Sequence, residues 1–165
     1  MRAHAAARGA LLEVRRFALA TRTAEDAARQ VGTDVGRIVK SLVFVAESEP
    51  VVALCCGDAR VDEGLLATAL GARRVRRASA EEAKELTGYA IGGVPPFGHA
   101  RPCRLVADEG LLRFDLVWAA AGLPDAVFPI APHELVRISG ALVAPIAQRS
   151  SSSSGDSSSP SYSSE

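Results

Sequence analysis

The sequence predicts one α/β domain of the α+β type, in which helices surround a mixed, partly barrel-like β-sheet. Short strand and helix patterns alternate irregularly, and several neighbouring strand patterns are separated only by a turn. A doubly wound parallel sheet would need a more regular alternation. A length of 165 residues suits one domain rather than two.

The first half of the chain predicts three helices and a hairpin. Thr23 and Asp26 resemble a capping box, and Gly32 and Gly71 are typical helix ends. Residues 47–50 form the expected hairpin turn. In order, the expected elements are a helix with apolar residues from Leu11 to Leu19, a helix over 23–31, strands over 38–46 and 51–56, and a helix over 62–70.

The second half predicts a helix, a loop and several short strands. Ser79 and Glu82 form a capping box, and Gly88 ends that helix. The Gly/Pro-rich residues 89–102 cannot form regular structure. The expected elements around them are strands over 73–77, 104–107, 114–119, 126–130 and 142–146, and a helical turn over 132–136.

The composition is that of a globular protein with an aliphatic core. Hydrophobic residues make up 48%, charged residues 23% and aromatic residues only 5%. Residues 1–149 hold 19 Lys and Arg against 17 Asp and Glu. This small basic excess argues against a protein that wraps duplex nucleic acid, but it permits brief contact with one end of a nucleic acid.

Cysteine usage and the N-terminus favour a cytoplasmic protein. Cys55, Cys56 and Cys103 are odd in number and include no CxxC pair, so a disulfide framework is not expected. No apolar run has the length of a membrane span. The Ala/Arg-rich start lacks a signal-peptide pattern, although it also resembles a transit peptide.

Both ends of the chain are expected to lie outside the folded domain, which the sequence predicts over residues 9–149. Residues 1–8 are predicted to be flexible. Residues 150–165 are mostly Ser and have too little apolar surface to offset the entropy cost of ordering, so we expect a disordered and inert tail rather than a linker or modification site.

The usual catalytic signatures are missing. The sequence has no HExxH, no GxSxG and no GxGxxG after a strand, and its three histidines lack metal-ligand spacing. Residues 93–98 have the spacing of a phosphate loop, but Lys-Ser/Thr does not follow, and two prolines remove N–H groups. The commonest metal, nucleotide and serine-hydrolase sites are therefore excluded.

Lys40 lies in an otherwise apolar strand, on the same face as Leu42 and Phe44. A charge is costly there if it is buried alone. Pattern alone favours a lysine that reaches solvent at the start of the strand. The functional interpretation is a fixed cation that binds a phosphate or a carbonyl oxygen in a pocket.

The loop GGVPPFGH, residues 92–99, is the second candidate. Gly92 and Gly93 permit close approach of a ligand to the backbone, and the prolines stiffen the loop. Its N–H groups could stabilise an oxyanion. A rigid surface turn explains the same residues equally well.

Two further features have competing explanations. Cys55 and Cys56 could supply a thiol nucleophile, but an apolar strand favours core packing. A basic patch is formed by Arg73, Arg74, Arg76 and Arg77, with Arg101 and Arg104 as further candidates. It is either a nucleic-acid contact or a solvated strand face.

Three segments of this chain resemble the YbaK/prolyl-tRNA-synthetase-associated family in order and spacing, over about residues 20–148. They are TAEDAARQVGTDVGRIVKSLVFV, GARRVRRASAEEAKELTGYAIGGVPPFGHARP and ELVRISGALVAPIA. The pairing of IVKSLVF with TGYAIGGVPPFGH is the specific signal.

The resemblance implies a partial barrel with outer helices and an aminoacyl-tRNA deacylase that edits mischarged tRNA. It implies no metal and no organic cofactor. The family includes free-standing deacylases and a domain inserted in some prolyl-tRNA synthetases, and this chain is expected to be free-standing. Its partners are expected to be the 3′ end of mischarged tRNA and an aminoacyl-tRNA synthetase.

The predicted site has Lys40, Gly92 and Gly93 as catalytic residues. Its predicted substrate-binding residues are Ser41, Pro96, Gly98 and His99. Lys40 would hold the terminal nucleotide, loop N–H groups would bind the ester carbonyl, and water or a group of the substrate would attack.

Two alternatives stay open, a non-catalytic amino-acid or synthetase-associated binding module and a hydrolase of another small ester or amide. The amino acid (Cys, Ala, Ser or Thr among others), the tRNA and the oligomeric state also stay open.

Overall fold

The computed structural model describes residues 1–18, 21 and 23–149. The helices and 3₁₀ turns (η) are α1 (Arg2–Ala6), α2 (Ala24–Val31), η1 (Val35–Arg37), α3 (Glu63–Leu70), α4 (Ala80–Thr87), η2 (Glu109–Arg113) and α5 (Pro132–Ser139). The strands are β1 (Arg15–Arg16), β2 (Val39–Ala46), β3 (Glu49–Cys56), β4 (Ala59–Val61), β5 (Val75–Arg77), β6 (Arg104–Asp108), β7 (Val117–Ala120), β8 (Ala126–Ile130), β9 (Leu142–Ala144) and β10 (Ala147–Arg149).

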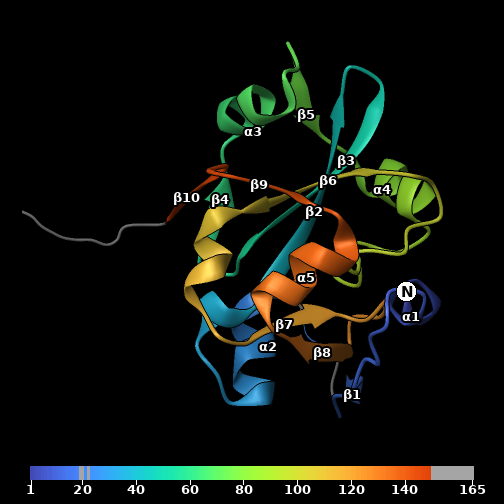
Figure 1. The fold of residues 1–165 in the computed structure, drawn as a ribbon, viewed down its shortest axis with the longest axis vertical. Helices are drawn as coiled ribbons and strands as arrows, with labels where there is room; N and C mark the ends of the chain where they lie inside the picture. The colour runs from blue at the N-terminus through green and yellow to red at the C-terminus, as the bar shows by residue number, and fades with distance from the viewer. Residues whose placement is uncertain (19–20, 22, 150–165) are drawn as a thin grey trace, which may run out of the picture.

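A five-stranded mixed sheet with the order β5-β2-β3-β6-β9 forms the centre of the molecule (Figure 1). The β3–β6 and β6–β9 pairs are parallel, and the pairs β2–β3 and β2–β5 are antiparallel. A second, antiparallel sheet has the order β1-β8-β7. A parallel bridge between Ile38 and Trp118 joins the two sheets, so the described strands curve around one core without closing a barrel. The mixed sheet with outer helices confirms the predicted fold class.

The β2–β3 hairpin forms as predicted, but its turn is tighter. Glu47 and Ser48 alone connect the strands, and both have positive φ angles, 49° and 80°. Such angles at both central residues are typical of a two-residue hairpin turn whose twist matches that of the strands. Glu49 and Pro50, expected in the turn, belong to β3 instead.

The predicted helix ends are confirmed by their capping bonds. The Thr23 hydroxyl accepts a hydrogen bond from the Asp26 amide at 3.0 Å, and the Asp62 carboxylate accepts one from the Leu65 amide at 2.9 Å. Ser79 and Glu82 form the reciprocal capping box. The glycines that follow these three helices are all left-handed, as the sequence predicts: Gly32, Gly71 and Gly88.

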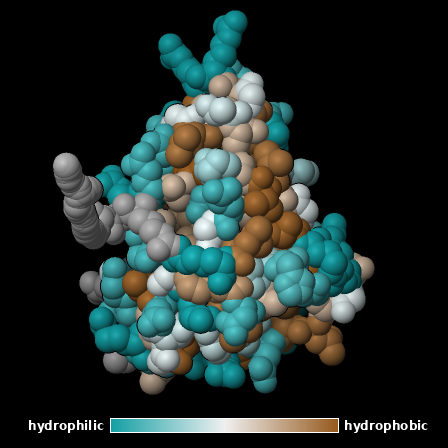
Figure 2. Space-filling model, turned by 60° about the vertical axis from the view of Figure 1, so that its left-hand side comes forward, coloured by the Kyte–Doolittle hydropathy of each residue, from teal (hydrophilic) through white to brown (hydrophobic). Residues whose placement is uncertain are grey.

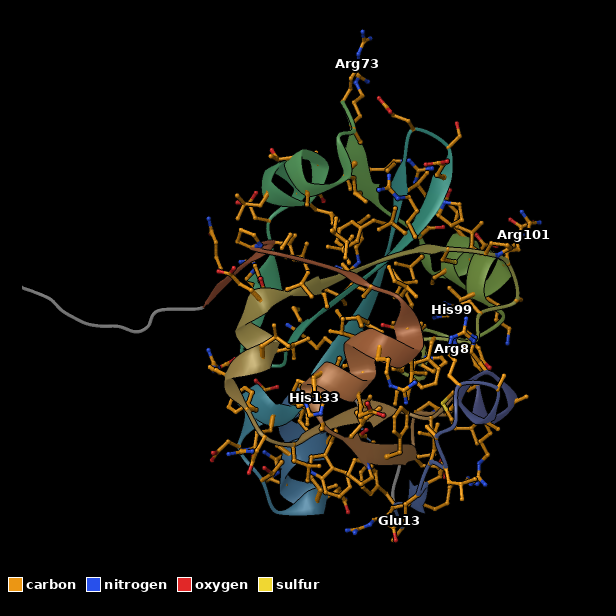
Figure 3. All side chains as sticks on the ribbon, viewed as in Figure 1. Arg8, Glu13, Arg73, His99, Arg101 and His133 are labelled. Atoms are coloured by element: carbon orange, nitrogen blue, oxygen red, sulfur yellow. The ribbon has the colours of Figure 1, made fainter. Side chains whose placement is uncertain are left out.

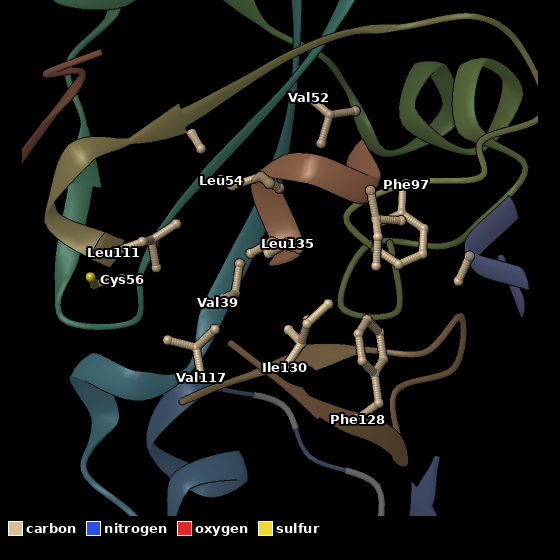
Figure 4. Packing of buried hydrophobic residues seen from close by; sticks show 14 of the residues in the cluster. Val39, Val52, Leu54, Cys56, Phe97, Leu111, Val117, Phe128, Ile130 and Leu135 are labelled. Carbon is tan, nitrogen blue, oxygen red and sulfur yellow. The ribbon is translucent and has the colours of Figure 1, made fainter. Parts of the chain in front are cut away.

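The largest hydrophobic cluster lies between the central sheet, the β7–β8 hairpin and α5 (Figure 4). Leu54, Phe97, Phe128 and Leu135 are fully buried in it. Phe97 comes from the irregular loop, and its ring lies 5.9 Å from that of Phe128. The candidate substrate loop is therefore anchored in the core of the domain.

Buried Asp108 connects the central sheet to the C-terminal strands. One carboxylate oxygen accepts hydrogen bonds from the amides of Ile146 (2.9 Å) and Ala147 (3.1 Å). The other accepts one from Gly110 at 3.1 Å and caps η2. These bonds place β10 beside β4, and neither strand was predicted.

The N-terminal segment differs from its prediction. Residues 11–19 were expected to form a helix, but β1 lies within this segment and pairs with β8. Leu12 and Val14 pack on the core, whereas Leu11 is 97% exposed, so these residues follow the twofold period of an extended chain. Residues 1–8, expected to be flexible, contain α1, whose Ala5 is fully buried.

The remaining boundaries shift by a few residues. β7 begins at Val117 rather than at 114, and the helical turn at 132 continues through Ser139 as α5. No helix among the described residues is long and apolar enough to cross a bilayer. The Ser-rich residues 150–165 lie outside the described part of the chain.

Candidate functional site

A cavity of about 250 Å³ lies where β2 begins, between α2 and the β7–β8 hairpin. Its apolar wall includes Ala27, Ile38, Trp118 and Val127. Its polar side chains among the described residues are those of Thr21, Thr23, Lys40 and Ser41. The site combines an apolar chamber with a cation and several hydroxyl groups.

The cavity exists because one edge of β2 is open here. β5 pairs with β2 at Phe44–Ala46, and no strand among the described residues pairs with Ser41 on that side. The Ala78 amide donates to the Val43 carbonyl at 3.0 Å, which shows that Val43 directs its backbone groups away from β3. Backbone direction alternates along an antiparallel strand, so the N–H and C=O of Ser41 point the same way, toward the open edge.

Lys40 precedes Ser41 in β2 and is paired with Cys55 of β3. Its ammonium group donates a hydrogen bond to the carbonyl oxygen of Ala59, and its side chain is half-buried. The charge is therefore neither solvent-exposed nor buried alone. Lys40 is among the residues that line the cavity.

Ser41 contributes an unusual polar group beside Lys40. Its hydroxyl oxygen is buried and has no hydrogen-bond partner among the described residues. Buried hydroxyl groups normally have a partner, because an unsatisfied one costs about 1–3 kcal/mol. The hydroxyl is thus available to a ligand or a water molecule in the cavity.

The loop contributes Gly92 and Val94 to the cavity wall. Gly92 has a φ of 93°, a conformation that favours glycine. The amide of Gly93 donates to the Ala90 carbonyl at 2.9 Å and is not available to a substrate. The amides of Gly92 and Val94 have no acceptor within the described part of the chain, so they are the candidate donors.

Pro96, Gly98 and His99 do not line this cavity and instead lie where the loop is anchored. The Nε2 atom of His99 lies 2.7 Å from the Pro95 carbonyl oxygen, so Nε2 carries the proton and donates. Burial lowers the pKa of His99, which favours the neutral ring. His99 lies on the side of the molecule that carries α1 (Figure 3).

Helix α1 supports the loop from outside. The rings of His4 and Phe97 stack with centroids 5.3 Å apart, and the His4 Nε2 atom lies 3.0 Å from the Ile138 carbonyl oxygen. A side chain at Gly98 would lie 2.7 Å from the Met1 Cα atom. These contacts fix the loop, and with it Gly92 and Val94.

Cys55 and Cys56 are core residues, as their strand pattern indicates. Both side chains are buried, at 0% and 1% exposure. Burial raises the pKa of the Cys55 thiol to about 12, and the nearby Lys40 ammonium offsets this only in part. A thiol with this pKa holds almost no thiolate near pH 7, so Cys55 is a poor nucleophile.

We therefore expect the Cys55→Ala and Cys56→Ala variants to lose stability rather than rate. Removing a buried sulfur should cost about 1 kcal/mol of unfolding free energy. The rate of ester hydrolysis at saturating protein should stay within about twofold of the wild type, because no thiolate takes part. Urea unfolding and single-turnover kinetics measure the two effects, and a tenfold slower but folded variant would support a thiol mechanism.

The apolar wall of the cavity was not found from the sequence. Ala27, Trp118 and Val127 come from α2, β7 and β8, and no motif connects them with Lys40. The bridge between Ile38 and Trp118, the β7–β8 pairing and a shared hydrophobic cluster bring these segments together. The described residues contain no group of three or more His, Cys, Asp or Glu side chains that could hold a metal ion.

Residues 19–138 match the model of the family described as "Aminoacyl-tRNA editing domain". The chain is 35% identical over 128 residues to the uncharacterized protein YwhH of Bacillus subtilis, covering 77% of this chain and 81% of YwhH. It is 34% identical over 112 residues to the multifunctional Ser/Thr-tRNA deacylase ProXp-y of Escherichia coli, covering 65% of this chain and 67% of that protein.

Solved structures and larger enzymes give similar matches. A crystal structure described as a proposed trans-editing enzyme for prolyl-tRNA synthetase superposes with a TM-score of 0.79 at 47% identity, covering 83% of this chain and 87% of that one. The proline–tRNA ligase of Lactobacillus gasseri is 42% identical over 73 residues, which span 44% of this chain but only 13% of the ligase.

Proposed function

This chain belongs to the aminoacyl-tRNA editing domain family, and on that premise we propose that it is a deacylase acting on mischarged tRNA. The reaction is hydrolysis of the ester between a wrongly attached amino acid and the terminal ribose. One observation supports the proposal: Lys40, Ser41, Gly92 and Val94 line one cavity that also has an apolar wall.

The relatives support hydrolysis and action in trans. ProXp-y is named a Ser/Thr-tRNA deacylase, and a structure with 47% identity is described as a proposed trans-editing enzyme. Since both are similar to most of this chain, we propose that it also acts on tRNA already released by a synthetase. An aminoacyl-tRNA synthetase as a binding partner and a cytoplasmic location stay predictions.

In the proposed mechanism, the ester enters at the open edge of β2. The Lys40 ammonium binds the ribose or phosphate of the terminal nucleotide, and the amides of Gly92 and Val94 bind the ester carbonyl oxygen. These donors can stabilise the negative charge that develops on that oxygen in the tetrahedral intermediate. The amino-acid side chain lies against the apolar wall around Trp118.

The attacking group is proposed to be water, assisted by the substrate. The described lining of the cavity contains no Asp, Glu, His or Cys side chain that could act as a general base or thiol nucleophile. The water oxygen bonds to the carbonyl carbon, the bond from this carbon to the ribose oxygen breaks, and that oxygen leaves with a proton. The substrate's own amine or hydroxyl is the remaining group that can accept the proton from water.

A deacylation panel tests the function directly. We expect at least one of cysteinyl-, alanyl-, seryl- and threonyl-tRNA to be hydrolysed at a rate that rises with protein concentration, while correctly charged prolyl-tRNA is spared. Loss of radiolabelled amino acid from tRNA measures the rate. Binding of these tRNAs with no hydrolysis of any would favour the non-catalytic module instead.

A further inference from the structure

We propose that the open edge of β2 and the basic strand β5 form the path along which the acceptor end of tRNA lies. The path runs from the cavity past Arg77 to Arg73 and Arg74, which contact phosphates of the acceptor stem. This inference rests on the proposed function, and it adds which surface binds the RNA.

Alternate residues of β2 connect the cavity to the surface formed by Arg73, Arg74 and Arg76. Ser41 and Val94 line both the cavity and a small neighbouring hollow of about 20 Å³, whose wall also includes Val43 and Arg77. Val45 lines an open groove beyond this hollow, together with Arg73, Arg74 and Arg76. Ser41, Val43 and Val45 lie at alternate positions of β2 and point to the same face, so the depressions that they line follow one another along this strand.

The length of this path suits an unpaired acceptor end. Arg77 is paired with Phe44, and Arg76 with Val45, in the β2–β5 register. Phe44 and Val45 follow Lys40 by four and five residues, so at 3.3–3.4 Å per residue the two arginines lie about 13–17 Å along the strand from Lys40. The four unpaired nucleotides at a tRNA 3′ end, stacked at about 3.4 Å each, cover about 14 Å. The end of the stem then reaches β5 when the terminal ribose is at Lys40.

The arginines of β5 and the turn before it differ in how they are engaged. Arg76 forms two hydrogen bonds of 2.8 Å with Glu82, and together with the Ser79 amide it lowers the pKa of that carboxyl to about 2. Arg77 lies over the Phe44 ring at 5.6 Å. Arg73 and Arg74 are exposed and form no ion pair within the described part of the chain, so their charges are available to phosphate.

The surface views agree with this placement. Arg73 projects from the end of the molecule that carries α3 and β5 (Figure 3), where hydrophilic side chains extend into solvent (Figure 2). The cavity lies near the other end of β2, beside α2, β7 and β8 (Figure 1). Glu47 and Glu63 also line the groove, and Glu47 already accepts a hydrogen bond from the Arg73 amide at 3.0 Å. The available positive charge therefore lies with Arg73 and Arg74.

The test compares a full tRNA with a short ester that cannot reach β5. We use the double variant Arg73→Glu/Arg74→Glu and measure kcat/KM for mischarged tRNA and for the same amino acid esterified to adenosine. The ratio of the two values should fall about tenfold or more at low salt, because phosphate contacts are lost. The slope of log kcat/KM for tRNA against log salt concentration should become shallower by about 2, one unit for each lost contact.

The matched control is Arg60→Glu/Arg113→Glu, which makes the same charge change at exposed positions on β4 and η2. This control should keep the wild-type ratio. An unchanged ratio in the Arg73→Glu/Arg74→Glu variant, or an equal fall in the control, would overturn the proposed surface.

Direct RNA binding separates this inference from the proposed function. Fluorescence anisotropy with an uncharged acceptor-stem RNA reports binding even if no ester is hydrolysed. The Arg73→Glu/Arg74→Glu variant should raise Kd about tenfold relative to the control at low salt. If the wild-type protein hydrolyses no ester but shows this difference, the function is wrong and the surface stands. If both double variants bind the RNA equally, the surface is wrong.

Discussion

Replacing Lys40 by alanine should leave the fold intact and slow ester hydrolysis about a hundredfold. Lys40 lines the cavity, and its ammonium group has one observed hydrogen bond, to the Ala59 carbonyl. Losing one charge-assisted hydrogen bond in the transition state costs about 3 kcal/mol, which is about a hundredfold in rate. The fold should tolerate the change, because the cavity can supply water to the Ala59 carbonyl.

Single-turnover hydrolysis and thermal unfolding measure the two effects of Lys40→Ala separately. Lys40→Arg should restore only part of the rate, since a planar guanidinium cannot occupy the position of a compact ammonium. Lys84→Ala is the matched control, because Lys84 is exposed on α4 and does not line the cavity. A folded Lys40→Ala protein that clears every mischarged tRNA at the wild-type rate would remove Lys40 from the site.

The elements that the sequence predicts well depend on local chemistry. Ser79 and Glu82 are three residues apart and cap α4 whatever the rest of the chain does. The apolar run of β2 and its hairpin with β3 are similarly local. By contrast, β4 pairs with β10 across more than eighty residues, and neither three-residue strand has a pattern of its own. Pairing of that kind depends on tertiary contacts, which no local pattern contains.

In the candidate site, too, some features follow from local sequence and others depend on tertiary contacts. Lys40, Ser41 and Gly92 were predicted, and all three line one cavity. The carbonyl partner of Lys40, Ala59, and the apolar wall around Trp118 depend on pairing between distant strands. The sequence could show that the loop is rigid, but not that Phe97 anchors it or that the Gly93 amide is already engaged.

Adding a methyl group at Gly93 should slow hydrolysis about tenfold with a smaller loss of stability. A Cβ atom there would lie 3.1 Å from the Gly122 carbonyl oxygen and from two backbone atoms of Leu123. These atoms are backbone and cannot rotate away, so the loop and the β7–β8 turn must separate by a few tenths of an ångström. Val94 and Leu123 line the cavity on the two sides of this contact. A misplacement of 1 Å can cost about a hundredfold in rate, so a shift of this size should cost about tenfold.

Variants at two other glycines show whether a slower rate comes from displacement of the loop or from backbone strain in general. Gly71 has a φ of 68° and no atom within 4 Å of an added Cβ, so Gly71→Ala should lose stability at unchanged rate. Gly92 has a φ of 93° and equally open space, so Gly92→Ala strains the loop backbone without a collision. If the position of the loop sets the rate, Gly93→Ala and Gly92→Ala should both hydrolyse more slowly than Gly71→Ala at equal folded fraction. Equal rates in all three would mean that the loop amides do not bind the reacting carbonyl, and Lys40 would then remain as the candidate for charge stabilisation.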